Sequence, residues 1–265
     1  IQNKKSRKKW RETIRKEFRD MIKRGVWRNV PRATMSEGRR LIGSKWVFRE
    51  KRDGRFRARL VCLGYSQVPG VDFSDNFAPV VNDVTFRVTQ VLKMFFGLEC
   101  VLIDVETAFL YGRLDEEIYM KVPEGYTEVY GAIPEHIIFL LLMAMYGLVQ
   151  AARQWYKYLL ETLVEKKKFI PSAADPCLVY RNDEAGFCML LMYVDDNLVI
   201  GTRKAIEKTI KELKSYFNVT VNEEMHDYLG CNVKNGNDCG WIGQPHLYKN
   251  MEKKFNEFLV TLKYT

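Results

Sequence analysis

The most unusual stretch of this chain places two carboxylates between two apolar segments: Phe187-Cys188-Met189-Leu190-Leu191-Met192-Tyr193-Val194-Asp195-Asp196-Asn197-Leu198-Val199-Ile200. The apolar runs at 187–194 and 198–200, with a polar break between them, predict a hairpin of two buried strands. Adjacent carboxylates at the edge of a low-dielectric core repel each other, and a bound divalent cation removes that penalty. The stretch therefore indicates a metal site, with an ordinary acidic turn as the alternative.

Asp104 stands in a similar context. It ends the short apolar segment 100–105, which predicts another buried strand, and Val105 follows it. If this strand neighbours the hairpin, Asp104, Asp195 and Asp196 meet at one end of a sheet. Hard oxygen ligands in that number suit Mg²⁺, which also binds substrate phosphates. Two such ions activate a 3′-hydroxyl and stabilise a leaving pyrophosphate, so metal-dependent phosphoryl transfer and a structural turn both remain open.

The positive charge of the chain is concentrated at its N-terminus. The net charge is +9, residues 1–28 hold 12 basic and 3 acidic residues, and residues 29–265 carry 30 of each sign. Such a concentration favours a polyanionic partner, either nucleic acid or an anionic membrane face, over a merely solvated helix face. The residues expected to make this contact are Lys4, Lys5, Arg7, Lys8 and Lys9.

Composition excludes two other classes of protein. The longest apolar run, 137–145, is too short to span a bilayer. The six cysteines include no Cys-x-x-Cys pair, so we expect buried thiols in a reducing compartment and no disulfide framework.

Apolar spacing along the chain predicts an α+β fold with antiparallel strands covered by helices. The stripe Trp10, Ile14, Phe18 and Ile22 predicts a basic amphipathic helix that ends at Gly25. We expect further helices at 83–96, 151–168, 206–217 and 247–262, strands at 45–50 and 55–63 around a tight turn at Asp53-Gly54, and a long insertion at 112–136.

The expected strand at 55–63 alternates basic and apolar residues. Arg55, Arg57 and Arg59 fall at every second position, so a strand places all three guanidinium groups on one face. A row of planar forks suits phosphate oxygens. A charged edge strand that prevents aggregation is the alternative interpretation.

Tyr193-Val194-Asp195-Asp196 resembles the Tyr-x-Asp-Asp box of reverse transcriptases. The chain is similar over roughly residues 8–260 to the polymerases of copia-type (Pseudoviridae) LTR retrotransposons. The matching stretches are Ser44-Lys45-Trp46-Val47-Phe48, Ala58-Arg59-Leu60-Val61, Gly70-Val71-Asp72-Phe73, Phe77-Ala78-Pro79-Val80, 104–110, 112–122, Tyr146-Gly147-Leu148, Gln150, Trp155-Tyr156 and Asp175-Pro176.

This resemblance implies a right-hand polymerase fold with fingers, a palm built on an antiparallel sheet, and a partial thumb. It assigns residues 1–79 and 112–150 to the fingers, 80–111 and 151–235 to the palm, and 236–265 to the start of the thumb. It also implies a fragment of a Pol polyprotein or a domesticated remnant of one.

The resemblance further implies roles for individual residues. Asp104, Asp195 and Asp196 would be catalytic and would hold two Mg²⁺ ions together with Val105, with Mn²⁺ able to substitute. Phe109 would lie under the incoming sugar and exclude a 2′-hydroxyl, and Gln150 would lie beside that sugar. The remaining implied contacts are Lys45, Arg57 and Arg59 to the triphosphate, Tyr228, Leu229 and Gly230 as the primer grip, and Tyr193 to nucleic acid.

The implied activity is RNA-directed DNA polymerisation. Its partners would be an RNA template, a DNA primer, deoxynucleotides, and a ribonuclease H region or other Pol parts, with no membrane, in cytoplasmic virus-like particles or the nucleus. Ala152 stands where the family usually has proline, and the basic hairpin is short. A non-catalytic nucleic-acid-binding or scaffold subunit that retains the fold is the alternative. A metal-dependent nuclease would leave Phe109 and the arginines of the hairpin without a purpose.

Overall fold

The computed structural model describes residues 4–50, 54–223, 228–235 and 240–262, so Asp53 of the expected turn lies outside the described residues. The chain divides into two compact units. Unit 1 contains residues 1–79 and 107–162, and unit 2 contains residues 80–106 and 163–265. No helix in the described ranges is long and apolar enough to cross a membrane.

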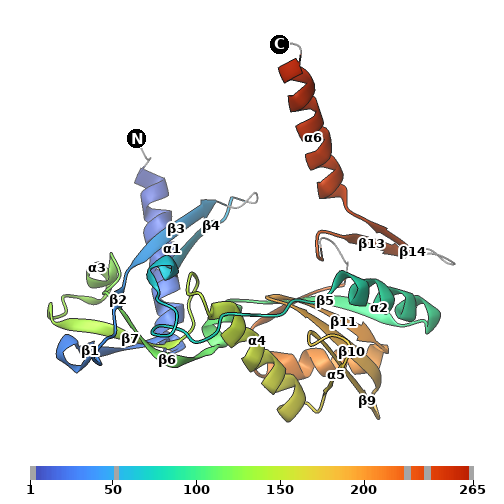
Figure 1. Cartoon of the computed structure of the whole chain (residues 1–265), viewed down its shortest axis with the longest axis horizontal. Helices are drawn as coiled ribbons and strands as arrows, with labels where there is room; N and C mark the ends of the chain where they lie inside the picture. Colours follow the sequence, from blue (N-terminus) through green and yellow to red (C-terminus); the bar gives the residue numbers. More distant parts are fainter. Residues whose placement is uncertain (1–3, 51–53, 224–227, 236–239, 263–265) are drawn as a thin grey trace. The chain divides into compact units, whose positions relative to one another are not determined.

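Unit 1 is built on a four-stranded sheet with the order β1-β7-β6-β2 (Figure 1). Its strands are β1 (Trp27–Pro31), β2 (Leu41–Ile42), β6 (Arg113–Met120) and β7 (Ile137–Met143). Helix α1 (Lys4–Lys23) packs against the core beside this sheet. Helix α4 (Ala151–Glu161) lies near the end of the second segment of the unit, residues 107–162. The expected insertion at 112–136 is thus wrong in part, because β6 lies within it and pairs with β7.

The basic helix at the N-terminus is confirmed, with one shift in its buried face. Phe18 and Met21 are fully buried, whereas Ile22 is 42% exposed. The Phe18 ring meets the Trp46 ring edge-on at 5.1 Å between centroids. The buried face therefore continues from Phe18 to Met21, three residues on, and not to Ile22, four residues on. Both spacings fall on one helix face because a turn has 3.6 residues.

The expected basic hairpin forms from β3 (Ser44–Glu50) and β4 (Phe56–Cys62), which are antiparallel. Ala58, Leu60 and Cys62 of β4 are buried while the residues between them are half-buried, as the period of two predicts. Arg57 and Arg59 consequently lie on the face opposite the core.

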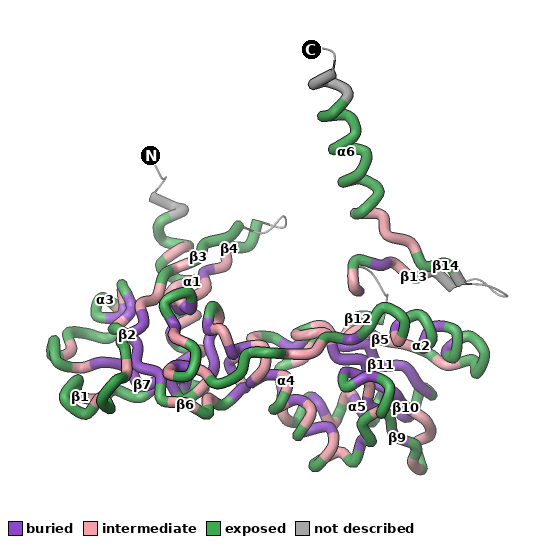
Figure 2. The backbone as a smooth tube through the Cα atoms, in the orientation of Figure 1, coloured by how far each residue is buried: buried purple, intermediate pink, exposed green. Residues whose placement is uncertain are grey.

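Unit 2 is built on a six-stranded sheet with the order β12-β5-β11-β10-β9-β8. Its strands are β5 (Glu99–Val105), β8 (Ile170–Pro171), β9 (Leu178–Asp183), β10 (Gly186–Tyr193), β11 (Asp196–Gly201) and β12 (Val219–Asn222). The tube in Figure 2 shows the central strands buried, since Leu190, Leu191, Val199 and Ile200 are fully covered. The predicted strand at 100–105 and the predicted hairpin are both confirmed.

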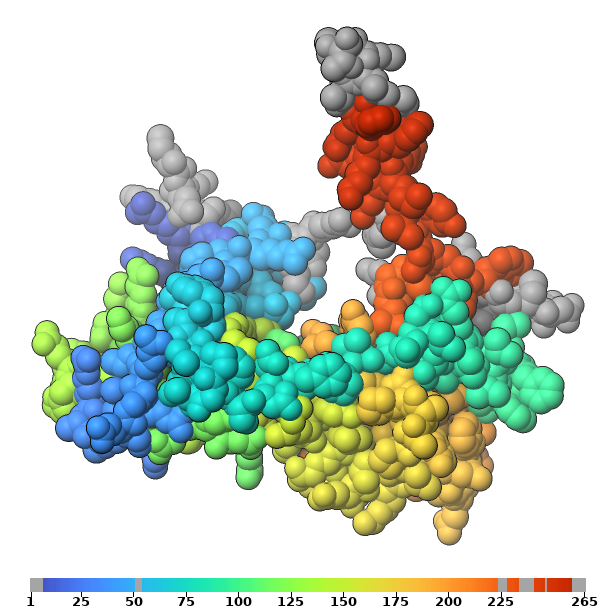
Figure 3. Space-filling view, in the orientation of Figure 1, coloured from blue at the N-terminus to red at the C-terminus, as the bar shows by residue number. Residues whose placement is uncertain are grey.

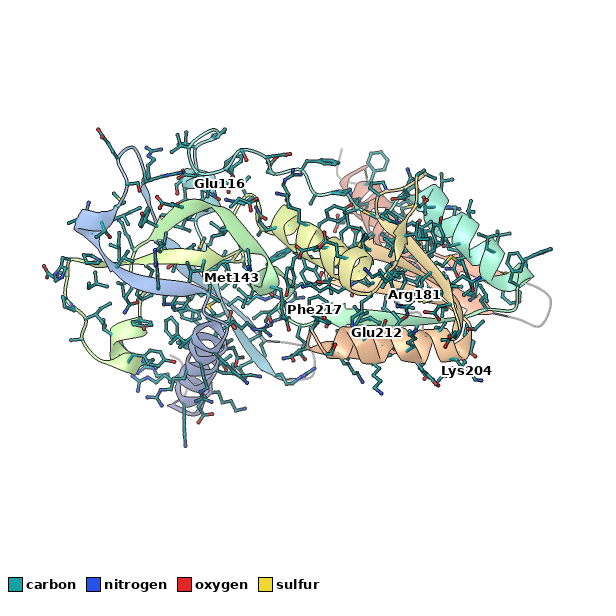
Figure 4. The ribbon with its side chains drawn as sticks, turned by 90° about the horizontal axis from the view of Figure 1, so that it is seen from below. Glu116, Met143, Arg181, Lys204, Glu212 and Phe217 are labelled. Atoms are coloured by element: carbon teal, nitrogen blue, oxygen red, sulfur yellow. The ribbon has the colours of Figure 1, made fainter. Side chains whose placement is uncertain are left out.

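Two helices of unit 2 lie against this sheet: α2 (Asp83–Phe95) and α5 (Arg203–Lys214). An ion-pair cluster fastens α5 to β9, as the labelled side chains of Figure 4 show. Arg181 is almost fully buried and pairs with Glu212 at 2.9 Å and with Asp183 at 3.0 Å. Because both partners are present, the guanidinium charge is compensated inside the unit.

Helix α2 lies at the surface of unit 2 (Figure 3). Its outward side chains Val84, Val88, Val91 and Phe95 are apolar and exposed. The last described elements are the hairpin β13 (Asn232–Asn235) and β14 (Gly240–Gly243), and helix α6 (Pro245–Leu262). Along α6, Met251, Phe255 and Phe258 are all more than half exposed. The expected helix near the chain end is therefore confirmed, while its role as the start of a thumb stays a prediction.

Candidate functional site

Two of the three predicted carboxylates face each other across a strand pair in unit 2. Strand β11 is antiparallel to β5, and Asp196 is the register partner of Asp104. Side chains of directly opposed residues leave an antiparallel sheet on the same face with their Cβ atoms about 5 Å apart. Asp104 is exposed and Asp196 is half-buried, so both are open to a ligand from solvent.

Asp195 lies in the turn between β10 and β11, beside the same strand end. Its carbonyl oxygen accepts a hydrogen bond from the Val105 amide at 2.9 Å. Because Val105 directly follows Asp104, this bond holds the turn beside Asp104. Val194 has a φ of 51°, an uncommon conformation for a β-branched residue and a sign that the turn is over-determined by its surroundings. Asp104, Asp195 and Asp196 thus lie at the same end of the neighbouring strands β5 and β11.

Asn197 is a member of this site that the sequence prediction missed. It is 2% exposed, and its side-chain amide donates to the Asp195 carbonyl at 3.3 Å. Its Oδ1 atom is buried without a hydrogen-bond partner. The position of Asn197, directly after the acidic pair and before an apolar strand, could have indicated a side chain that supports the turn.

The carboxylates at this end of β5 and β11 are of a type that suits a divalent metal ion. Carboxylate oxygens are the ligands that Mg²⁺ and Mn²⁺ prefer, and Mg²⁺ normally completes its shell with waters and substrate phosphates. In the described part of the chain, no three His, Cys, Asp or Glu side chains are already gathered as a metal cage. Strand register aligns Asp104 with Asp196, and Asp195 lies in the adjoining turn. Their role as metal ligands stays a prediction.

Tyr228 supports the acidic turn from the interior of unit 2. Its side chain is fully buried, its hydroxyl donates to the Leu191 carbonyl at 3.3 Å, and its ring meets the Tyr193 ring at 6.2 Å. Burial, and next the negative charge of Asp196, raise the pKa of Tyr228 well above its usual value. The phenol is therefore a neutral donor, and Tyr193 is half-buried against it.

The predicted primer grip begins at this tyrosine. Leu229 is half-buried with a φ of 55°, and Gly230 is exposed with a φ of 71°. Because the Tyr228 side chain has no exposed surface, only Leu229, Gly230 and the backbone are open to a primer. The grip itself stays a prediction.

Unit 1 presents a basic face on the hairpin. The register pairs Arg49 with Arg57 and Val47 with Arg59, so these residues share one face, and Lys45 lies on it as well. Lys45 and Arg49 are exposed, while Arg57 and Arg59 are half-buried. Arg49 was missed from the sequence, although its spacing of four residues from Lys45 places it on that face.

The guanidinium group of Arg59 lies over an aromatic ring, and its charge acts on the half-buried acid Glu17. Its guanidinium carbon lies 4.4 Å from the centroid of the Tyr146 ring. Its Nε atom is buried without a hydrogen-bond partner. Glu17 of α1 accepts a hydrogen bond from the Leu60 amide, and burial raises the pKa of Glu17 despite the opposing charges of Arg59 and Arg57. The contact with the Tyr146 ring fixes the guanidinium group of Arg59.

Phe109 belongs to unit 1, in the short 3₁₀ helix η3 (Ala108–Tyr111). It is half-buried, packs against the core of the unit, and meets the Tyr146 ring at 5.2 Å. The residue is therefore braced from behind, as a steric gate requires. Its contact with a nucleotide sugar stays a prediction.

Gln150 is fully buried, and both ends of its amide are occupied. Its oxygen accepts from the Gln67 amide at 3.0 Å, and its nitrogen donates to the Asp72 carbonyl at 3.0 Å. Each end of the amide can make one further hydrogen bond, and its contact with the nucleotide stays a prediction. Gln67 was missed from the sequence, where a lone glutamine in a loop carries no signal.

The predicted polyanion contacts lie on α1. Arg7, Lys8 and Lys9 are exposed, and the Lys9 ammonium lies 5.1 Å from the Phe56 ring centroid. The side chains of Lys4 and Lys5 lie outside the described residues. The exposed cations keep a positive face on this helix.

Comparison with known proteins identifies the class. A family model described as reverse transcriptase (RNA-dependent DNA polymerase) matches residues 25–263. The chain therefore belongs to the reverse transcriptase family.

The relatives narrow this class to transposon polyproteins. The chain is 33% identical over 254 residues to the retrovirus-related Pol polyprotein from transposon TNT 1-94 of Nicotiana tabacum. The aligned region covers 92% of this chain and 19% of that protein. It is 32% identical to the retrovirus-related Pol polyprotein from transposon RE2 of Arabidopsis thaliana, over 85% of this chain and 16% of the relative. It is 25% identical to the transposon Ty1-NL2 Gag-Pol polyprotein of Saccharomyces cerevisiae, over 97% of this chain and 14% of the relative.

These matches confirm the resemblance to copia-type reverse transcriptases. The chain spans less than a fifth of the length of each of these relatives.

Proposed function

We propose that this chain carries the RNA-directed DNA polymerase activity of a copia-type Pol protein, adding deoxynucleotides to a primer 3′-hydroxyl. One observation carries the proposal. Asp104 and Asp196 oppose each other on β5 and β11 with Asp195 in the adjoining turn, in a chain that belongs to the reverse transcriptase family. Paired carboxylates at the ends of two neighbouring strands can hold the metal ions that nucleotidyl transfer of this kind needs.

Asp104, Asp195 and Asp196 would hold two Mg²⁺ ions, with Mn²⁺ able to substitute, and Val105 would contribute through its backbone. When bound, the ions supply a polarised 3′-hydroxyl and charge stabilisation at the leaving pyrophosphate. The protein itself fixes the carboxylates through strand register and holds the turn through Asn197 and Val105. Positioning of this kind accounts for most of the protein's part in phosphoryl transfer.

The basic face of the hairpin is the proposed site of the triphosphate. Arg59 and Arg57 offer planar forks that bind phosphate oxygens bidentately, and Lys45 adds a point charge. Phe109 is the proposed gate, since a flat, braced ring leaves no room for a 2′-hydroxyl. We assign the hairpin to the fingers and the six-stranded sheet to the palm of a right-hand polymerase, with α6 as the start of the thumb.

The proposed macromolecular partners are an RNA template and a DNA primer. The exposed cations Arg7, Lys8 and Lys9 of α1 support the contact with phosphates. Leu229 and Gly230 have surface open to the primer strand.

The test is primer extension on an RNA template with deoxynucleotides and Mg²⁺. Asp195→Asn is expected to abolish extension while leaving the affinity for template-primer nearly unchanged, because the substitution removes a metal ligand and no phosphate contact. Asp83→Asn is the matched control. Asp83 is an exposed acid on α2 of the same unit, paired only at the surface with Arg87, and its substitution should leave extension intact.

Extension by wild type that is lost in Asp195→Asn supports the polymerase and the metal site together. Substantial extension by Asp195→Asn rejects the assignment of the site. No extension by wild type, with tight and salt-sensitive binding of template-primer, favours a non-catalytic nucleic-acid-binding subunit instead.

A further inference from the structure

The ring of Tyr146 contacts both residues on which nucleotide selection by unit 1 is proposed to rest. The Arg59 guanidinium carbon lies 4.4 Å from the centroid of the Tyr146 ring. The Phe109 ring lies 5.2 Å from the same ring, tilted by 59°. Arg59, the proposed triphosphate contact, and Phe109, the proposed sugar gate, therefore share Tyr146 as an aromatic neighbour. Tyr146 itself has no part in either proposed role.

The backbone fixes this tyrosine against the end of β4. The Cys62 amide donates to the Tyr146 carbonyl at 2.8 Å. Gly147 follows with a φ of +88°, and a Cβ there would overlap the Cys62 carbonyl oxygen and a methyl group of Val61. A Cβ on Gly64 would in turn overlap the Gly147 carbonyl oxygen. The close approach of these backbones needs glycine at both positions, and it holds the Tyr146 Cα at a fixed distance from β4.

The other end of the same segment is fastened by buried amides. Val149 donates its backbone N–H to the Gln67 side-chain oxygen at 2.8 Å, and Gln67 donates to Gln150 at 3.0 Å. Gln150 is fully buried and Gln67 is 8% exposed, so these bonds are shielded from competing water. Residues 146–150 are thus held at both ends, and the Tyr146 ring is carried on a rigid support.

We propose that Tyr146 is a positioning residue for nucleotide selection: it holds the guanidinium of Arg59 and the ring of Phe109 at a fixed spacing. This inference rests on the proposed polymerase function. A gate excludes a 2′-hydroxyl only if its ring cannot yield, and Tyr146 backs the ring of Phe109. A guanidinium over an aromatic face keeps its plane parallel to that face, which aims the fork of Arg59 at one set of phosphate oxygens.

The variants Tyr146→Leu and Tyr146→Phe separate this role from general packing. Leucine fills much of the space but offers no aromatic face, whereas phenylalanine keeps the ring. The measurement is kcat and KM for a deoxynucleotide and for the matching ribonucleotide. Tyr146→Leu is expected to raise the KM for the deoxynucleotide and to lower discrimination against the ribonucleotide by about tenfold, the effect of losing one or two aromatic contacts. Tyr146→Phe is expected to stay within about twofold of wild type, well below the effect of a lost aromatic contact.

Two controls make the result specific. Tyr216 of unit 2 has the same kind of contact, with the Lys167 ammonium 4.8 Å from its ring, so Tyr216→Leu should leave sugar discrimination unchanged. In a Phe109→Ala background, Tyr146→Leu should add nothing to the loss of discrimination, because the two residues act on one step. An additive loss, or wild-type discrimination in a folded Tyr146→Leu protein, overturns the inference.

The same ratio is measured at equilibrium, as Kd values for dATP and ATP in the presence of template-primer. This readout does not depend on extension, so failure of the polymerase assay in wild type counts against the proposed function alone. If Tyr146→Leu does not fold, Tyr146→His is used, which keeps a smaller flat ring. It should retain part of the discrimination, and wild-type discrimination in a folded Tyr146→His protein overturns the inference.

Discussion

Asp104 and Asp196 are direct register partners on β5 and β11, so two carboxylates leave the sheet on the same face at the same level. Like charges directly opposite each other destabilise a strand pair by a few tenths to about 1 kcal/mol. A divalent cation between them would reverse the sign of that contribution. The stability of unit 2 should therefore report directly on metal binding.

Asp196→Asn should raise the melting temperature slightly in metal-free buffer, because it removes this repulsion. The same substitution should abolish most of the rise in melting temperature that MgCl₂ or MnCl₂ produces in wild type. A ligand at 100 times its Kd stabilises by about 2.7 kcal/mol, and thermal unfolding at matched ionic strength measures the difference. An equal metal-dependent rise in Asp196→Asn and wild type contradicts the assignment.

Phe109→Ala should increase the incorporation of ribonucleotides relative to deoxynucleotides. The change removes the ring that Tyr146 backs at 5.2 Å and opens space where a 2′-hydroxyl would lie. Competition between a ribonucleotide and its deoxy counterpart in primer extension measures the ratio. Tyr65→Ala, at a tyrosine that is 84% exposed in the same unit, is the control for losing an aromatic ring. Unchanged sugar selectivity in Phe109→Ala removes the gate role.

Glu17→Gln should stabilise the protein at neutral pH and lose this advantage in acid. Burial raises the pKa of Glu17 above its usual 4.5, so the folded state binds a proton more tightly than the unfolded state does. Stability consequently falls as pH rises from about 4.5 through the raised pKa. Glutamine keeps an acceptor for the Leu60 amide and carries no charge, so the Glu17→Gln protein should be more stable than wild type at pH 7.

Urea unfolding at pH 4 and pH 7 measures this difference. Glu12→Gln, at an exposed acid on the same helix, should have no comparable effect. A destabilised Glu17→Gln at pH 7 would mean that the attraction of Arg59 and Arg57 outweighs the burial of the carboxylate.

Tyr228→Phe should destabilise unit 2 by about 1 kcal/mol and reduce extension without changing sugar selectivity. The fully buried hydroxyl donates to the Leu191 carbonyl at 3.3 Å, and phenylalanine leaves that carbonyl without this donor. Thermal unfolding and primer extension measure the two effects. Tyr65→Phe is the surface control, and a Tyr228→Phe protein as stable as wild type would show that the hydrogen bond contributes nothing.

The acidic site could be predicted from sequence because its elements are local and strongly patterned. An apolar run on each side of Asp195 and Asp196 specifies a hairpin, and Asp104 ends a third apolar run. The pairing of Asp104 with Asp196 is long-range, and only the requirement that carboxylates share a metal suggested it. The register itself came from the structure.

The four-stranded sheet of unit 1 was harder to predict. Strand β7 is a continuous apolar run, which periodicity cannot distinguish from a buried helix. Strand β6 carries Asp115, Glu116 and Glu117 in a row, which reads as a loop. In the structure Glu116 accepts from Ser74 at 3.0 Å and Glu117 accepts from Ser36 at 2.6 Å, so acids within a strand serve distant loops. Such partners have no local signature.

The supporting residues of the site were missed for the same reason. Asn197, Gln67 and Tyr146 act through contacts with residues far along the chain or through backbone groups. Their residue types are ordinary in turns and cores. Only the three-dimensional neighbours reveal that each one fixes a residue of the predicted site.

The division of unit 1 into residues 1–79 and 107–162 has a consequence for its synthesis. Strand β1 pairs with β7, and Trp27 meets Leu141 across that pair. A ribosome that adds about 5–20 residues per second therefore completes β1 roughly 5–25 s before its partner strand exists. During that interval the apolar side chains of β1 and α1 have no sheet to cover them. A chain truncated before residue 137 would therefore have a unit 1 without a central strand of its sheet.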